Sequence, residues 1–265
     1  LGRFLQRCGL AVDSPELVLL HGACSSGLVA LNLAVRQVQR EPGLKILVIG
    51  LESELNPERF LSIKKLGAIS SETDPRRSCQ PFSTYRTGLV PGEVMVAALV
   101  GARPYGSQTS GDILLIPGMS TSDASRLTDC LESGEYLREC LSRPLEGLQG
   151  KLDFVCPHGT STPLNARVEG QVLNEFFRDQ APMKLIPLKG YLGHTLNSSG
   201  LWEAILNGEF LRHNFLPALG NVDPLEPLTH LEFLRAPYEG PLSRCLKLAI
   251  GFGGINSSLL LEKVG

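Results

Sequence analysis

The sequence lacks any long hydrophobic run. Its longest, around residues 94–100, has the length of a β-strand, whereas a membrane helix needs about 20 apolar residues. The chain does not open with the basic and apolar segments of a secretion signal. Charge is nearly balanced, with 25 Lys and Arg against 27 Asp and Glu, so no strong field favours nucleic acid or an anionic membrane. We therefore expect a cytoplasmic protein with no membrane span and no nucleic-acid partner.

Paired cysteine motifs are also absent. The seven cysteines are odd in number, widely spaced and free of C-x-x-C, which argues against a disulfide framework or a zinc site. Most should be buried as small apolar side chains in a reducing compartment, and no metal site is expected. They occupy positions 8, 24, 79, 130, 140, 156 and 245.

The composition is otherwise that of a globular protein. It is 43% hydrophobic, 20% charged and only 6% aromatic, which excludes disordered, collagen-like and coiled-coil chains. The 28 Gly and 18 Pro favour the many turns of a layered α/β protein. A polar, glycine-containing stretch at residues 105–111 indicates two domains, 1–111 and 112–265. The first residue is Leu1, so we expect a fragment, a trimmed product or an excised part.

Hydrophobic patterning predicts alternating strands and helices, which favours βαβ units and a mostly parallel sheet. Residues 17–23 are predicted to form a buried strand that leads into a helix over residues 28–40, and residues 3–10 could end a helix. No self-similarity between the two halves is evident. The other predicted strands span residues 45–50, 94–100, 112–116, 152–156, 184–188, 246–252 and 257–263, and the other predicted helices span residues 166–178 and 201–212.

Cys24 is a nucleophile candidate because it stands between a predicted strand and a predicted helix. The positive end of the helix dipole would lower the pKa of the thiol, and the free N–H groups of the helix could stabilise an oxyanion. A cysteine in such a place is more often a buried structural residue when it stands alone.

Two histidines occupy comparable positions in the second half. His158 lies in HGTST and His194 in KGYLGHTLNSSG, each beside glycine at the end of a predicted element. Two such imidazoles could face one cleft, although each alone is more often a capping or solvent-exposed residue. His21, His213 and His230 lack this setting.

Three further features lie near these positions. Lys189 precedes His194 and could hold a carbonyl or carboxylate oxygen or tune the imidazole, or could be a surface lysine. Glu203 falls in the first turn of a predicted helix, where the dipole alone favours a carboxylate. The glycine-rich segment 251–256 lacks nucleotide-loop spacing and a following helix. It is predicted to be either an ordinary hairpin turn or a flexible backbone segment whose amide and Phe252 ring border an acyl site.

Together these motifs resemble a β-ketoacyl synthase of the thiolase superfamily. The family's segments occur in order: GACSSG, PFSTYRTGLVPGE, HGTST, KGYLGH with NSSG and Glu203, and GFGGIN. The resemblance implies an α/β fold of the thiolase-like layered αβαβα type. Because only 23 residues precede Cys24, we expect the N-terminal half to be incomplete, lacking about the N-terminal third of the fold. Sheet edges and apolar faces would then lie open.

The resemblance also implies the site. Cys24 would take an acyl group, and the backbone amides of Cys24 and Phe252 would form the oxyanion hole. His158 and His194 would assist decarboxylation of a malonyl-type extender, and the resulting carbanion equivalent would attack the acyl group on Cys24. The other residues carried over are Lys189 and Glu203 as support for the second histidine, Thr160 and Thr162 as contacts of the phosphopantetheine arm, and Phe252 with Gly253 at the acyl site.

The implied activity is that of a β-ketoacyl-[acyl carrier protein] synthase of fatty acid or polyketide synthesis. No tightly bound cofactor is expected, since phosphopantetheine would arrive on the acyl carrier protein. That carrier is one expected partner, and a homodimer or heterodimer through the missing N-terminal part is the other. Two alternatives remain: a non-condensing thiolase-like acyltransferase, and a catalytically incompetent fragment that acts as a partner subunit or carrier-docking surface. The basic residues Lys64, Lys65, Arg76 and Arg77 could meet an acidic carrier or form a solvated loop.

Several positions depart from the family pattern, and we expect them to change substrate range and loop geometry more than the reaction. Since Cys24 and both histidines are retained, the resemblance argues against a chain-length-factor-type subunit. The departures are Ser83, Pro157, the pair Asn165-Ala166 and the run Asn197-Ser198-Ser199.

Overall fold

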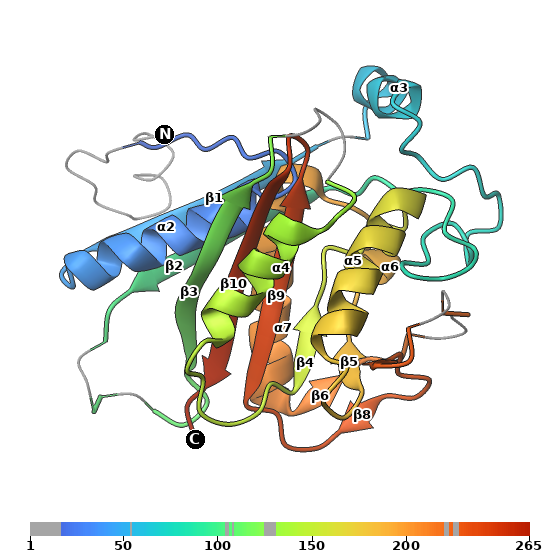
Figure 1. Cartoon of the computed structure of the whole chain (residues 1–265). Coiled ribbons are helices and arrows are strands. Elements are labelled where there is room, and N and C mark those ends of the chain that lie inside the picture. Colours follow the sequence, from blue (N-terminus) through green and yellow to red (C-terminus); the bar gives the residue numbers. More distant parts are fainter. Residues whose placement is uncertain are drawn as a thin grey trace.

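The computed structural model describes residues 17–53, 55–103, 106–107, 109–124, 131–219, 223–224 and 228–265. The helix end predicted for residues 3–10 lies outside these ranges, as do Cys8, Cys130 and part of the polar stretch at residues 105–111. Figure 1 shows the described elements in chain order.

A six-stranded sheet forms the centre of the molecule, with strand order β3-β10-β9-β4-β5-β7 (Figure 1). The pairs β3–β10 and β10–β9 are antiparallel, and the remaining three pairs are parallel. Three of the five strand pairs are thus parallel, in agreement with the predicted mostly parallel sheet, and the antiparallel side arises where the glycine-rich turn joins β9 and β10 as a hairpin. The strands are β3 (Ile113–Ser122), β4 (Phe154–Cys156), β5 (Met183–Leu185), β7 (Leu231–Glu232), β9 (Arg244–Gly251) and β10 (Ile255–Lys263).

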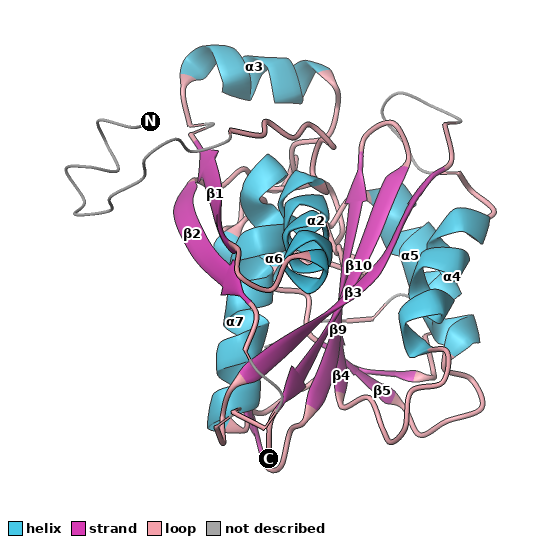
Figure 2. Ribbon diagram, turned by 90° about the vertical axis from the view of Figure 1, so that its left-hand side faces the viewer, coloured by secondary structure: helices cyan, strands magenta, loops and turns pink. Residues whose placement is uncertain are grey.

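Helices cover both faces of this sheet (Figure 2). On one face, α2 (Ser26–Arg40) and α7 (Ser199–His213) lie between the central sheet and a second, antiparallel sheet of β1 (Lys45–Glu52) and β2 (Val94–Gly101). On the other face lie α4 (Glu135–Ser142) and α5 (Pro163–Phe176). The described residues thus supply four of the five layers expected for the αβαβα fold.

Several short elements connect these layers. They are α3 (Pro57–Lys65), α6 (Lys189–Leu192), the single-turn helices η1 (Arg143–Leu145) and η2 (Leu196–Ser198), and the small antiparallel pair β6 (Phe215–Leu216) and β8 (Tyr238–Glu239). No helix in the described part of the chain combines the length and apolar character needed to cross a bilayer.

Apolar periodicity predicts the main elements well. The predicted helix over residues 28–40 is confirmed as α2, and the face formed by Leu28, Leu31, Val35 and Val38 is buried. The predicted strands at residues 45–50, 94–100, 246–252 and 257–263 are confirmed as β1, β2, β9 and β10. Two separate apolar cores result, one on each face of the central sheet.

The buried strand predicted for residues 17–23 is wrong. Leu17, Val18 and Leu19 are 62%, 67% and 75% exposed. In this segment only Gly22 makes an isolated bridge, with Cys24, and no described strand pairs with residues 17–21. An apolar run becomes a buried strand only where neighbours accept its backbone hydrogen bonds and cover its side chains. Here the described residues provide neither.

An apolar face also lies open on the outer side of the β1–β2 sheet. Leu47, Ile49 and Leu51 of β1 and Met95 and Leu99 of β2 are exposed. The alternate residues of the same strands are buried against α2 and α7. The expectation of uncovered apolar surface in the N-terminal half therefore agrees with the structure.

Helices α2 and α7 cross at their first turns with backbone against backbone. A Cβ on Gly27 would lie 2.8 Å from the amide nitrogen of Leu201, and one on Gly200 would lie 2.7 Å from that of Leu28. Both helices begin with the sequence SSGL, at residues 25–28 and 198–201. The preceding turns also match, because Ala23 and Leu196 both have positive φ angles, 47° and 37°. The two halves therefore share a local similarity around the functional loops.

Replacing Gly200 with alanine should destabilise the fold. Glycine-to-alanine changes within helices usually stabilise by up to about 1 kcal/mol, but the 2.7 Å approach to Leu28 should reverse the sign. We expect G200A to lower the free energy of unfolding by about 1–3 kcal/mol, measured by urea denaturation. The control is G208A in the same helix, where the nearest atom is 3.6 Å away. A G200A variant as stable as G208A would contradict the close crossing.

Candidate active site

Cys24, His158 and His194 line one cavity of about 340 Å³. Cys24 comes just before α2, His158 from the loop after β4, and His194 from the segment between α6 and η2. The bridge between Pro91 and His194 ties the last of these segments to the loop before β2. Residues far apart in the sequence therefore meet where the two sheets and helices α2 and α7 come together.

The two histidines form a buried pair. Their ring centroids are 5.3 Å apart with the rings nearly perpendicular, and the residues are only 4% and 1% exposed. Burial, and then the positive charge of Lys189, hold the pKa of His158 and of His194 well below 6.5. Both imidazoles are therefore neutral at physiological pH, and each can donate one hydrogen bond and accept another.

Ser199 orients His194. Its Oγ lies 2.9 Å from His194 Nδ1, and Thr195 Oγ1 lies 3.3 Å from the same hydroxyl. This contact engages Nδ1 and leaves Nε2 of His194 for other partners. On His158, Nδ1 has no hydrogen-bonding partner among the described residues.

Buried charged groups next to the cavity hold the backbone of the loop that carries His158. Lys189 does not line the cavity, but its Nζ donates to the carbonyl of His158 at 2.6 Å and to Glu203 Oε1 at 2.8 Å. Lys189 and Glu203 are 1% and 2% exposed, so the surface-lysine alternative does not apply. Glu169 of α5 accepts from the backbone N–H groups of His158 at 2.6 Å and Gly159 at 2.9 Å.

Two buried residues of this region are missing from the sequence-based prediction. Glu169 resembles an ordinary polar position in a helix, and Lys247 interrupts the apolar strand β9. A signal for Glu169 is its place about two turns after HGTST, on the helix that the loop leads into. Lys247 carries a weaker signal, because a single charged residue inside an otherwise apolar strand requires buried partners.

Burial raises the pKa of the Cys24 thiol to about 11, although Lys189 opposes this shift. The predicted net lowering of the thiol pKa is therefore wrong, because desolvation outweighs the groups that lower it. The backbone N–H groups of Cys24 and Phe252 also act on the sulfur and lower the pKa, but they do not offset desolvation and the charge of Glu52. The convergence of these two amides on the sulfur places two donors where an oxyanion would form.

Three of the four residues predicted to contact substrate line the cavity, and the fourth does not. Thr160 and Thr162 line the cavity with their hydroxyl oxygens 2.9 Å apart. Phe252 also lines it and is 38% exposed, in the turn between β9 and β10. Gly253 follows in that turn with φ 81° and is not among the lining residues. In the described part of the chain, no group of three or more His, Cys, Asp or Glu is arranged to hold a metal ion.

A cysteine and two imidazoles gathered between the sheets of a layered α/β fold define a thiolase-like protein. Two family descriptions match the sequence: "Beta-ketoacyl synthase, N-terminal domain" over residues 16–103 and "Beta-ketoacyl synthase, C-terminal domain" over residues 116–223. The chain belongs to the β-ketoacyl synthase family. The family and fold expected from the sequence motifs are thereby confirmed.

Known proteins similar to the chain carry the same family name. The "3-oxoacyl-[acyl-carrier-protein] synthase 1" of Escherichia coli strain K12 is 27% identical over 252 residues, which cover 92% of this chain and 61% of that protein. The mitochondrial "3-oxoacyl-[acyl-carrier-protein] synthase" of Arabidopsis thaliana is 27% identical over 91% of this chain and 55% of its own length. The chain therefore spans less than two thirds of these relatives.

Solved structures show the same fold. A β-ketoacyl synthase from Burkholderia phymatum aligns with a TM-score of 0.82 and 25% identity, over 94% of this chain and 62% of that one. The ketosynthase ApeO, described in complex with its chain length factor ApeC from Xenorhabdus doucetiae, aligns with a TM-score of 0.84 and 26% identity, over 99% and 63%.

The buried histidines should make stability depend on pH. A histidine whose pKa is lower in the folded state than in the unfolded state takes up protons on unfolding. The free energy of unfolding should therefore be highest above about pH 6.5 and fall below it, by up to about 1.4 kcal/mol per pH unit for each histidine. Urea denaturation between about pH 8 and pH 5 measures the slope. The double variant H158Q/H194Q should flatten it, and H213Q, at the exposed end of α7, should not.

The thiol pKa predicts how Cys24 reacts. Alkylation of Cys24 by iodoacetamide should accelerate about tenfold per pH unit between about pH 7 and pH 10, because only the thiolate reacts and the pKa of the thiol is about 11. Peptide mass spectrometry reads the modification at Cys24 itself. A rate of alkylation that levels off near neutral pH would show instead that the pKa of the thiol is lowered, as the helix dipole predicts.

Proposed function

We propose that the chain carries the catalytic centre of a β-ketoacyl-[acyl carrier protein] synthase. The reaction is the decarboxylative Claisen condensation of a malonyl-type extender with an acyl group bound to Cys24. The observation that carries this proposal is the single cavity lined by Cys24, His158 and His194.

In the first half-reaction Cys24 accepts the acyl group. Its Sγ attacks the carbonyl carbon of the incoming thioester, and the carbonyl oxygen accepts hydrogen bonds from the backbone N–H groups of Cys24 and Phe252. The carrier's thiol leaves as the acyl-enzyme forms. Because the pKa of Cys24 is about 11, the sulfur enters as a thiol, and its proton passes to a neutral imidazole in the cavity and then to the leaving thiolate.

In the second half-reaction the two histidines act on the extender. Each neutral ring donates one N–H to the extender's thioester oxygen, so that negative charge can develop there. The bond between the carboxylate and the α-carbon breaks, and carbon dioxide leaves. The electron pair of that bond stays with the α-carbon and forms the enolate. The α-carbon then attacks the acyl carbonyl, the new carbon–carbon bond forms, and Cys24 leaves as a thiolate that regains a proton. The pairing of two imidazoles in one cavity favours this condensation over simple acyl transfer, because acyl transfer needs one proton acceptor whereas two N–H donors can hold the enolate oxygen.

The proposed substrate arrives on an acyl carrier protein, which the names of both relatives include. Thr160 and Thr162 line the cavity and would receive the phosphopantetheine arm of the carrier, with no other cofactor. Lys64 and Lys65 are exposed at the end of α3 and offer positive charge to an acidic carrier.

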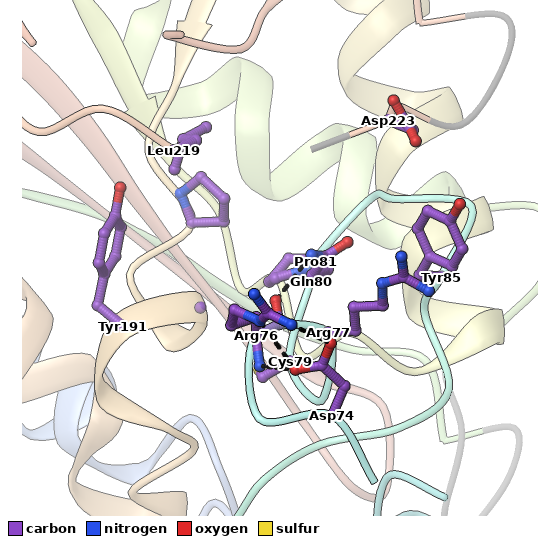
Figure 3. A pocket seen from close by; sticks show the side chains of 12 residues that line it. Asp74, Arg76, Arg77, Cys79, Gln80, Pro81, Tyr85, Tyr191, Leu219 and Asp223 are labelled. Atoms are coloured by element: carbon purple, nitrogen blue, oxygen red, sulfur yellow. Dashed lines mark hydrogen bonds and ion pairs between the residues drawn. The ribbon is translucent and has the colours of Figure 1, made fainter. Parts of the chain in front are cut away.

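The other two basic residues border a second cavity of about 530 Å³ (Figure 3). Arg76 pairs with Asp74 at 3.1 Å, and the Arg77 guanidinium lies 4.9 Å from the centre of the Tyr85 ring. Both arginines could add positive charge to a docking surface for an acidic carrier, although Asp74 offsets the charge of Arg76.

We also propose a dimer, with the exposed β1–β2 face covered either by a second ketosynthase or by a different subunit. A solved neighbour pairs a ketosynthase with a chain length factor, which illustrates the second arrangement. Residues 1–111 and 112–265 would form the two thiolase-like halves, in a cytoplasmic protein. The open apolar face is also the observation that favours the alternative role as a partner subunit.

Mass spectrometry of the 265-residue chain tests the proposal. Incubation with an acyl-carrier thioester should add the acyl mass to the peptide that contains Cys24, and C24A should abolish this adduct. With malonyl thioester added, carbon dioxide release should fall at least about a hundredfold in H158A and in H194A.

The matched control is C140A, which removes a buried cysteine of α4 that does not line the cavity. It should retain both acylation and decarboxylation. Acylation that persists in C24A would refute the nucleophile, and acylation without carbon dioxide release would favour a non-condensing acyltransferase.

A further inference from the structure

Lys247 is a fully buried lysine in the middle of the apolar strand β9. The strand lies between β10 and β4, and Lys247 pairs in register with Cys156 of β4 (Figure 1). An ammonium in such a place requires a full set of acceptors, because desolvation without partners would cost several kcal/mol.

Three oxygen atoms meet this requirement. Lys247 Nζ lies 2.5 Å from Glu203 Oε2, donates to the carbonyl of Pro157 at 2.9 Å, and donates to the carbonyl of Leu248 at 2.6 Å. Two of the three N–H donors of the ammonium thus have carbonyl acceptors, and its charge is balanced by the ion pair with Glu203. This set of contacts fixes both the charge and the position of the side chain.

Glu203 therefore bridges two ammonium groups. Its Oε1 meets Lys189 and its Oε2 meets Lys247. The same two lysines hold successive carbonyls, those of His158 and Pro157. Both peptide groups that flank the His158 ring are thus tied to one carboxylate of α7.

We propose that Lys247 is a positioning residue of the catalytic site: it ties Glu203 to the Pro157 carbonyl and so holds the backbone that carries His158. The inference rests on the function proposed above. Lys247 touches neither the cavity nor any reacting atom, and it acts through the loop and through its charge.

The charge of Lys247 acts on both histidines. It opposes their protonation and contributes to the low pKa of His158 and of His194. Removing the ammonium would leave Glu203 with one cation and would raise both histidine pKa values. The titratable groups that face Lys247 are Cys156 of β4, Glu203 of α7, Glu169 of α5, Lys189 of α6, Cys245 of its own strand and the two histidines.

The variant K247M tests the proposal in the full chain. Decarboxylation of malonyl thioester should fall about ten- to a hundredfold, whereas acylation of Cys24 should change less than about twofold, because His158 acts mainly in the second half-reaction. The neutral histidines are the active form, so activity is lost as pH falls through their pKa values. The pH at which activity is half lost on the acidic side should be about one unit higher in K247M.

NMR titration of the histidine ring protons gives a readout that does not need activity. Both buried rings should titrate at higher pH in K247M than in the unmodified chain. The matched control is L246A, which removes a buried side chain from the neighbouring position of β9 and should destabilise the fold without moving either titration. If the unmodified chain releases no carbon dioxide, the proposed function fails, and the titration still decides the role of Lys247.

Unchanged histidine titrations in K247M, or equal losses of acylation and decarboxylation, would overturn the proposal. If K247M does not fold, K247Q replaces it, because its amide can still donate to Pro157 while carrying no charge. Failure of both variants to fold would show a role in folding alone and would also overturn the proposal.

Discussion

The ion pair between Lys189 and Glu203 is the interaction on which the proposed catalytic centre depends. Its atoms are 2.8 Å apart and both side chains are almost fully buried. Such a pair is costly to desolvate unless every remaining lone pair and N–H is also used. The pair gains further partners in the His158 carbonyl, which accepts from Lys189, and in Lys247, which forms a second ion pair with Glu203. The same contacts therefore balance the buried charges and position the loop that carries His158.

The same dry environment sets the protonation states of the reacting groups. Burial raises the pKa of Cys24 and lowers that of both histidines, so the resting site holds a thiol and two neutral imidazoles. A preformed thiolate–imidazolium pair would need the opposite shifts. In the proposed reaction, proton transfer must then accompany attack on the thioester, at the moment when the substrate's carbonyl meets the two backbone amides.

Sequence patterns predict the elements that bury a continuous apolar face, such as α2 and the β9–β10 hairpin. They fail at residues 17–23, because strand formation there depends on neighbours that local periodicity cannot reveal. The motifs identify Cys24, His158 and His194, but only the strand order shows that they share a cavity. Glu169 and Lys247 stay hidden for a related reason: their roles come from contacts between elements far apart in the sequence. The pKa of Cys24 likewise follows from the depth of burial, which no local motif encodes.

The glycine contact between α2 and α7 has a mechanical consequence. No side chain lies between the two first turns at Gly27 and Gly200, so no compressible layer can absorb a shift of one helix against the other. Helix α2 follows directly on the nucleophile, and α7 carries Ser199 and Glu203, which steady the two imidazoles. A shift of one helix must therefore carry the other with it. The Cys24 sulfur and the two imidazoles would then keep their spacing if acyl chains enter and leave the cavity as proposed.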